Sequence, residues 1–433
     1  MDPWGHLEVI RKGYSYIFTI FASMKAKDIL MASLAAVALF SCAKNDQVQP
    51  QEESLPPARI VSKTHDDGSG MTVCQIEYPS CDPFGNPATF SGVITYGDEI
   101  TDSNPSLGIM LINRYTALGT ADTPSGGFLA VQKAMVGSGL VCVSSDHYGF
   151  GSTIDKDQAY CMGDTNAQTS IDALLSAREL LPELGVKFAL GKDKRVFNMG
   201  YSQGAQTAIG VLKVASEKYP DLRITHTFAG GGPYDMRETY SAMFDMAESI
   251  MPSTVIATLL SFNSLCNLGY PLEDIFQESA IKDIEKYILS KDYSRTQLEE
   301  IFPPQPLGAF LKDDILDLDS EISRKFLEAM ADENLCKGWT PRKGEKIFLS
   351  SHPSDDVVPS INAELLYSFL VEEQGLTNVD WYSSDGLSVL IPDSVPRHVS
   401  AVADFIVRTV SILRSDYYIS WFPDITKLLE EAL

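Results

Sequence analysis

Short apolar runs alternate with helical apolar repeats along the middle of the chain. Residues 107–112 and 140–143 are continuous apolar runs, the pattern of strands that are buried on both faces of a sheet. Between such runs, apolar residues recur every three or four positions, which predicts amphipathic helices. Strands are expected at 89–96, 107–112, 140–143, 195–199, 224–228 and 346–349. Helices are expected at 129–138, 164–181, 203–218 and 400–413. This alternation predicts an α/β fold with a mostly parallel central sheet and helices on both faces.

Two regions depart from that alternation. Residues 58–100 alternate polar and apolar positions between turn residues, which predicts β structure. Residues 236–340 contain no expected strand, and their helix-like segments are 253–265, 271–290 and 313–331. We therefore expect a core formed by 58–235 and 341–433, with 236–340 inserted between two sheet strands as a helical cap.

Composition narrows the class of protein. Hydrophobic residues make up 44% of the 433 residues and charged residues 21%, a normal globular mixture. The formal net charge is −24. So acidic a chain repels phosphates, which argues against nucleic-acid binding and against charge-driven docking on anionic lipid.

The N-terminal region has the features of an export signal. Met24 is followed by Lys25 and Lys27 and then by an apolar run, 29–40, which is too short for a comfortable membrane span. The run ends in Leu-Phe-Ser-Cys, which resembles a bacterial lipobox, and the resemblance implies that Cys42 is lipidated. An ordinary signal anchor with an unmodified cysteine is the alternative.

These features predict a division of the first 57 residues. Residues 1–41 form the signal region, with the lipoprotein signal in 24–41 and an over-annotated start in 1–23. The lipobox resemblance implies lipid attachment at the start of residues 42–57, and the polar stretch that follows and ends in two prolines predicts a tether. The expected location is that of an exported bacterial lipoprotein, anchored at the outer membrane or cell surface.

Six cysteines remain after Cys42. An even number in an exported chain permits disulfides, and Cys74 and Cys81 are close enough in sequence for a local loop. Cys142 lies in an apolar run, where a buried free thiol is equally expected. The sequence leaves the connectivity open.

Residues 200–204 carry the strongest chemical signal, the sequence Gly-Tyr-Ser-Gln-Gly. The pattern follows a short apolar strand and opens a helix, which is the setting that a nucleophile elbow requires. We expect Ser202 to be the nucleophile, with glycines flanking it because side chains would clash in so sharp a turn. The backbone N–H of Gln203 is then the first donor to an oxyanion.

A serine hydroxyl needs a general base, and His398 is the best candidate. In this architecture the acid and the histidine follow the serine in chain order, and His398 comes late, in an expected loop just before a helix. His226 lies within an expected strand, which favours a structural role. His352 comes too early for the base, although it can support the site.

The acid that orients the base is expected in a polar turn after a strand. The turn carries Asp355 and Asp356, followed by Val-Val-Pro. Both cannot point at one histidine, so we favour Asp355, with Asp356 as the alternative acid. Asp385 is a weaker candidate that is more typical of a turn.

Together these motifs resemble those of the α/β-hydrolases, and more narrowly those of the secretory lipases and their bacterial relatives. Residues 145–151 (Ser-Asp-His-Tyr-Gly-Phe-Gly) and 229–235 (Ala-Gly-Gly-Gly-Pro-Tyr-Asp) resemble two glycine-rich turns of that group. The resemblance implies that the cap is a lid and that a second oxyanion donor follows the first long strand. Many relatives have a His-Gly pair there, whereas this chain has Arg114 and Tyr115, either of which can supply a backbone N–H.

The expected function is therefore hydrolysis of carboxylic esters by a Ser-His-Asp triad through an acyl-enzyme. The substrate is a small-molecule, lipid or glycan ester, and the partners include a membrane but no nucleic acid. No metal-binding, P-loop or dinucleotide motif is present, so no cofactor and no metal are expected. The alternatives are a serine peptidase of the prolyl-peptidase type and a non-catalytic binding lipoprotein on a hydrolase scaffold.

Overall fold

The computed structural model describes residues 55–417, except 128, 136, 245, 247 and 387–394. The predicted signal region, Cys42 and most of the predicted tether lie outside the described residues. No helix within them is both long enough and apolar enough to cross a membrane.

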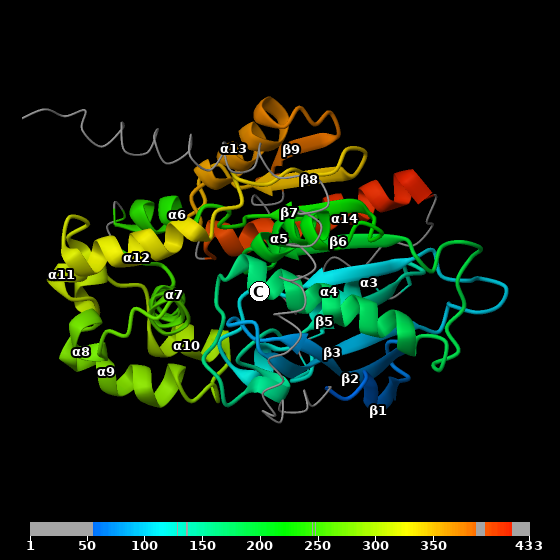
Figure 1. Cartoon of the computed structure of the whole chain (residues 1–433), viewed down its shortest axis with the longest axis horizontal. Coiled ribbons are helices and arrows are strands. Elements are labelled where there is room, and N and C mark those ends of the chain that lie inside the picture. Colours follow the sequence, from blue (N-terminus) through cyan, green and yellow to red (C-terminus); the bar gives the residue numbers. More distant parts are fainter. Residues whose placement is uncertain are drawn as a thin grey trace, which may run out of the picture. The chain divides into compact units, whose positions relative to one another are not determined.

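Nine strands form one mixed sheet in the described part of the chain, in the order β1-β2-β3-β5-β4-β6-β7-β8-β9 (Figure 1). The strands are β1 Arg59–Asp66, β2 Met71–Cys81, β3 Pro87–Gly97, β4 Ile109–Asn113, β5 Val141–Ser145, β6 Val196–Tyr201, β7 Ile224–Gly230, β8 Lys346–Ser351 and β9 Val379–Ser383. The first three are joined to each other and to β5 in antiparallel fashion, and all other pairs are parallel. The predicted α/β fold is confirmed.

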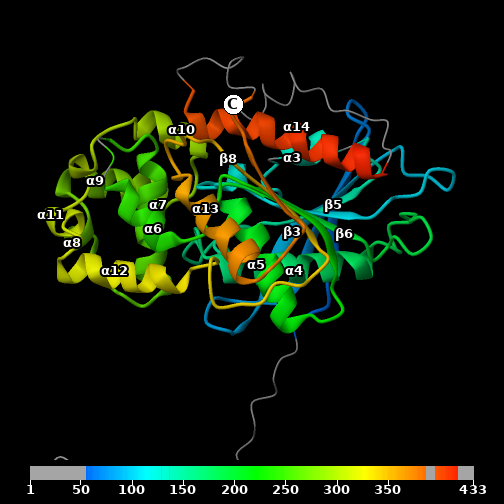
Figure 2. The ribbon, with the colours of Figure 1, turned by 90° about the horizontal axis from the view of Figure 1, so that it is seen from above.

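Helices cover both faces of this sheet (Figure 2). On one face lie α4 Gly163–Leu180, α5 Gln203–Lys218 and α13 Ile361–Ser368, and on the other lie α3 Ala130–Met135 and α14 Arg397–Tyr417. Successive side chains of a strand point to opposite faces, so Leu111 of β4 packs in the cluster with α4 and α5, whereas Ile112 packs in the cluster with α14. Burial on both faces explains why the strands appear in the sequence as continuous apolar runs.

The segment 236–340 consists of helices and loops, and none of its described residues belongs to the sheet. Its elements are α6 Met236–Met243, α7 Pro252–Leu265, α8 Leu272–Ile275, α9 Glu278–Asp283, η3 Ile284–Ile288, α10 Arg295–Ile301, η4 Leu307–Ala309, α11 Asp313–Leu316 and α12 Glu321–Asp332. They lie together beside the sheet (Figures 1 and 2). We call this segment the cap. Its two ends meet, because Asp235 and Asn334 form an isolated β-bridge.

Two helices predicted in the cap are interrupted. The helix predicted at 271–290 breaks at Phe276, whose backbone is extended because it forms a β-bridge with Leu311. The helix predicted at 313–331 breaks at 317–320, where the Ser320 hydroxyl accepts the Ser323 N–H and starts a new helix. In both places a specific tertiary or capping bond overrides the helical periodicity.

Three further features differ from the sequence analysis or were left open by it. The last described helix begins at Arg397 rather than at 400, so His398 lies in its first turn and not in a loop. Strand β9 was not predicted, because only its first residue, Val379, is buried. Cysteines 74, 81, 142, 161, 266 and 336 are all free thiols, so the permitted Cys74–Cys81 disulfide is not formed.

Candidate active site

Ser202 occupies a sharp turn between β6 and α5. Its backbone angles are φ 54° and ψ −125°, a conformation that non-glycine residues rarely adopt and that clusters at functional sites. A Cβ on Gly200 would collide with the carbonyl of Gly204, and one on Gly204 would collide with the carbonyl of Asn113. The flanking glycines are therefore required by close backbone contacts, as expected for a nucleophile elbow.

The His398 ring is held by Asp355. The Nδ1 atom of His398 lies 2.8 Å from Oδ2 of Asp355, and both side chains are almost fully buried. The other oxygen of Asp355 accepts the backbone N–H groups of Val357 and Val358, at 3.0 and 2.8 Å. These bonds fix the carboxylate in place, so it can determine which ring nitrogen carries the proton.

Asp356 contacts the backbone at the start of α14 rather than the imidazole of His398. Its two oxygens accept the N–H groups of Arg397 and His398, at 2.9 and 3.1 Å. These are N–H groups of the first turn of α14, which have no partner within the helix. Asp356 therefore starts the helix on which His398 lies, while Asp355 contacts the ring.

Residues 113–115 pass beside the elbow. The Arg114 guanidinium is buried, where its Nε donates to the carbonyl of Asp146 at 3.0 Å and its Cζ lies 4.9 Å from the centre of the Phe150 ring. Burial lowers the pKa of Arg114 to about 10. The side chain thus ties this loop to the turn after β5. The backbone carbonyls of Asn113 and Arg114 lie close to Gly204, in the first turn of α5.

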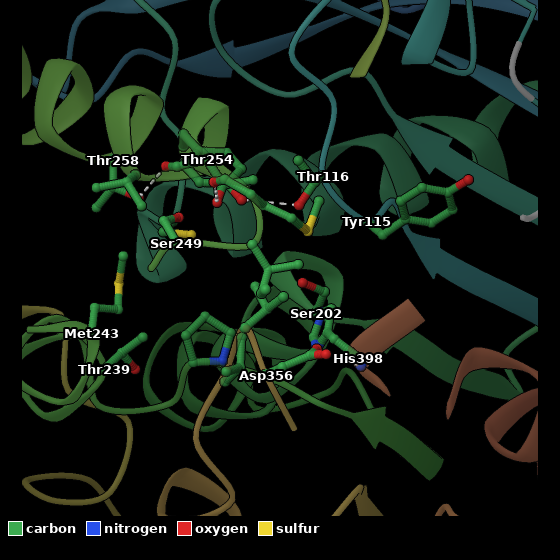
Figure 3. A pocket seen from close by; sticks show the side chains of 18 of the residues that line it. Tyr115, Thr116, Ser202, Thr239, Met243, Ser249, Thr254, Thr258, Asp356 and His398 are labelled. Carbon is green, nitrogen blue, oxygen red and sulfur yellow. Dashed lines mark hydrogen bonds between the residues drawn. The ribbon is translucent and has the colours of Figure 1, made fainter. Parts of the chain in front are cut away.

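A pocket joins this site to the cap. The pocket and the open solvent at its mouth together have a volume of about 1130 Å³. The pocket is lined by Ser202 and His398 on the core side and by residues of α6 and α7 on the cap side. Figure 3 shows Ser202 and His398 side by side, with Met243, Ser249, Thr254 and Thr258 across the pocket. Ser202 is partly exposed, so its hydroxyl is accessible from this space.

The remaining sequence candidates lie elsewhere or have other contacts. His226 is bonded through Nε2 to Asp416 at 2.9 Å, at the start of β7 and away from the carboxyl ends of the strands. His352 accepts the Ser354 N–H through Nδ1, and Asp385 is exposed after β9. The described residues include no cluster of three or more His, Cys, Asp or Glu side chains able to hold a metal ion.

Sequence reasoning missed the pocket wall and one buried tyrosine. Helix α7 is apolar or small on almost all sides and is buried accordingly. Such a sequence pattern predicts a buried helix, but it does not show which side of the helix faces a cavity. Tyr201 lines the pocket next to Ser202, but in the sequence it occupies a variable position of the pentapeptide. No local signal could have identified its contacts.

Several solved structures match this one over most of the chain. The rice cell wall degrading esterase LipA from Xanthomonas oryzae matches with a TM-score of 0.67 and 18% sequence identity, covering 84% of this chain and 97% of that one. The chain has the α/β-hydrolase fold. Candida antarctica lipase A in its closed state also matches, with a TM-score of 0.63 and 14% identity, covering 86% of this chain and 90% of that one. No protein-family model matches the sequence, and no curated protein does.

Proposed function

We propose that this α/β-hydrolase is a serine hydrolase that cleaves carboxylic esters. The observation that carries the proposal is the bond between Asp355 and the His398 ring, which lies beside Ser202 in its strained turn. This is the arrangement by which a base activates a hydroxyl and a carboxylate orients the base. The esterase and the lipase with the same fold support an ester substrate.

The reaction proceeds in two halves. Ser202 Oγ attacks the ester carbonyl while His398 Nε2 takes the hydroxyl proton, and Asp355 stabilises the imidazolium. The N–H of Gln203 and a backbone N–H of Arg114 or Tyr115 hold the negative oxygen of the tetrahedral intermediate. The proton then passes to the leaving alcohol, which departs. Water, deprotonated by the same histidine, releases the acid from Ser202.

The pocket wall favours an apolar acyl group. Three threonines of the wall use their hydroxyls within their own helices: Thr239 donates to Asp235, Thr254 to Met251 and Thr258 to Thr254. The protons of these hydroxyls are therefore already donated, so these threonines can offer a substrate only acceptor lone pairs. Methionines at 236, 243, 246 and 251 add adaptable apolar surface.

The division into core and cap belongs to the same proposal. Residues 58–235 and 341–433 act as the hydrolase core, and residues 236–340 act as a cap that completes the acyl pocket. We also propose that the chain is exported and anchored through a lipid on Cys42. Metabolic labelling with a radioactive fatty acid tests this. Labelling should be lost in Cys42→Ser, and an unlabelled wild type would contradict the anchor.

The hydrolase proposal is tested with a fluorophosphonate probe and a substrate panel. The wild type should label covalently, Ser202→Ala should not, and nitrophenyl esters of increasing acyl length should be cleaved in preference to dipeptide amides. Cleavage of amides without esters would favour a peptidase. A wild type that neither labels nor hydrolyses would indicate a non-catalytic binding protein.

A further inference from the structure

Tyr201 links the turn that carries Ser202 to the helix that carries His398. Its hydroxyl donates to the backbone carbonyl of His398 at 2.7 Å, although the two residues are 197 positions apart. Burial raises the pKa of Tyr201 well above its ordinary value, so the hydroxyl stays protonated and remains a donor. Because Tyr201 directly precedes Ser202, this bond restricts the distance between serine and histidine.

The Tyr201 ring also packs against α14. Its centre lies 5.2 Å from the imidazole of His398 and 5.4 Å from the ring of Phe405, two turns further along the same helix. The space for this packing is left by Gly231, whose φ is +58°. A Cβ there would lie 2.9 Å from the Tyr201 hydroxyl and 3.2 Å from Cε1 of His398.

His398 is thus held through three different groups. Asp356 accepts its backbone N–H, Tyr201 donates to its carbonyl and Asp355 contacts Nδ1 of its ring. Only the second ring nitrogen, Nε2, is left to act on Ser202. Few degrees of freedom remain for the imidazole, which is the condition under which a general base is effective.

We propose that Tyr201 and Asp356 are positioning residues, which fix His398 against Ser202 through the backbone of the first turn of α14. The proposal rests on the proposed ester hydrolysis. It assigns different functions to the two adjacent aspartates, since Asp355 orients the ring and Asp356 orients the residue that bears it. A misplacement of about 1 Å can cost on the order of a hundredfold in rate, so the effect should appear in kcat.

The first test compares Tyr201→Phe with Tyr234→Phe. Tyr201→Phe removes the hydroxyl and keeps the ring. Tyr234 is a matched control, because it is fully buried, lies outside the pocket, and its hydroxyl has no hydrogen-bond partner among the described residues. In Tyr201→Phe we expect kcat on a nitrophenyl ester and the rate of fluorophosphonate labelling to fall about tenfold or more, with KM within about twofold. Tyr234→Phe should retain both rates, and both variants should melt within a few degrees of the wild type.

A kcat in Tyr201→Phe equal to that in Tyr234→Phe would overturn the role of Tyr201, as would a loss explained entirely by KM. A wild type that neither labels nor hydrolyses any ester would overturn the proposed function itself, which distinguishes the two failures.

The second test uses Asp356 and stands even where Tyr201→Phe does not fold. Asp356→Asn keeps one oxygen that can accept an N–H group, whereas Asp356→Ala keeps none. We expect kcat to decrease in the order wild type, Asn, Ala, with partial rescue by the conservative variant. Equal kcat values in the three proteins would overturn the role of Asp356.

Discussion

At the scale of single residues, two adjacent carboxylates contact one histidine through different atoms. Asp355 reaches the imidazole and Asp356 reaches the backbone, because successive side chains in the turn after β8 point in different directions. The sequence could show that both cannot bind the ring. It could not show what the second one does, since that depends on where α14 begins.

Asp355→Asn should lower kcat by on the order of a thousandfold or more, because an amide can donate to Nδ1 and so favour the wrong tautomer of His398. Asp385→Asn is the control. It replaces an exposed aspartate outside the pocket and should leave kcat unchanged. Steady-state rates on one nitrophenyl ester measure both variants, and similar rates in both would contradict the assignment of Asp355.

Gly231→Ala should reduce both activity and stability. Alanine at a φ of +58° costs on the order of 1–2 kcal/mol. Its methyl group would also press on the Tyr201 hydroxyl and on His398. Gly185 also has a positive φ, but a Cβ there meets nothing within 4 Å, so Gly185→Ala isolates the backbone cost. Chemical denaturation should show a stability loss in both variants, larger in Gly231→Ala because of these added contacts, and ester turnover should show a loss of kcat only in Gly231→Ala.

At the scale of elements, the buried strands of the core and its helices other than α13 were predictable to within a few residues. Strands such as β4 and β6 are buried throughout and mostly apolar, and α4 and α5 repeat apolar residues with helical spacing. The breaks in the cap were not predictable, because they are caused by contacts between distant residues, such as the bridge of Phe276 with Leu311. Periodicity carries no information about such pairs.

The junction of cap and core should make stability depend on pH. Glu333 ends α12 and accepts the N–H of Gly163 at the start of α4, at 2.7 Å. Burial and the neighbouring Asp164 raise the pKa of Glu333 to about 7, while Lys213 opposes the shift. The folded chain therefore binds the proton of the Glu333 carboxyl more tightly than the unfolded chain does. The contribution of this protonated carboxyl to the free energy of unfolding is present below about pH 4.5 and is lost as the pH rises to about 7.

Glu333→Gln should remove that pH dependence. Between pH 4.5 and pH 8 the free energy of unfolding of the wild type should fall relative to that of the variant, by on the order of 2 kcal/mol after allowance for partial exposure. Glu179→Gln, at an exposed position of α4, should follow the wild type at every pH. Parallel denaturation curves for wild type and Glu333→Gln across this range would contradict the shift.

At the scale of the whole molecule, the fold gathers residues that are far apart in sequence. Parallel strands end at the same edge of the sheet, so the turns after β6 and β8 meet there, and chain order pointed to Ser202, to His398 and to the turn that carries Asp355 and Asp356 as the candidate residues. The pocket could not be predicted, because its wall is assembled from the cap and the core together. The contact between Tyr201 and His398 could not be predicted either, because the two residues are 197 positions apart in the sequence.

The thermal stability of the described part should not depend on reductant. All six of its cysteines are free, and Cys74, Cys142 and Cys161 are buried. Unfolding temperatures measured with and without dithiothreitol should agree. A clear decrease of the unfolding temperature with reductant would contradict this prediction, because it would indicate a disulfide. The control is Cys81→Ser, at an exposed position, which should have the same unfolding temperature as the wild type with and without dithiothreitol.

The position of α14 has a consequence for the order of folding. This helix supplies His398 and most of the apolar side chains that cover one face of the sheet, yet it is the last described element of the chain. Contacts between residues so distant in sequence form slowly, because a long loop must close first. A nascent chain that lacks α14 therefore has its serine turn but lacks the histidine proposed as the base. In refolding, recovery of ester turnover should lag behind recovery of secondary structure, so that activity reports the last docking step.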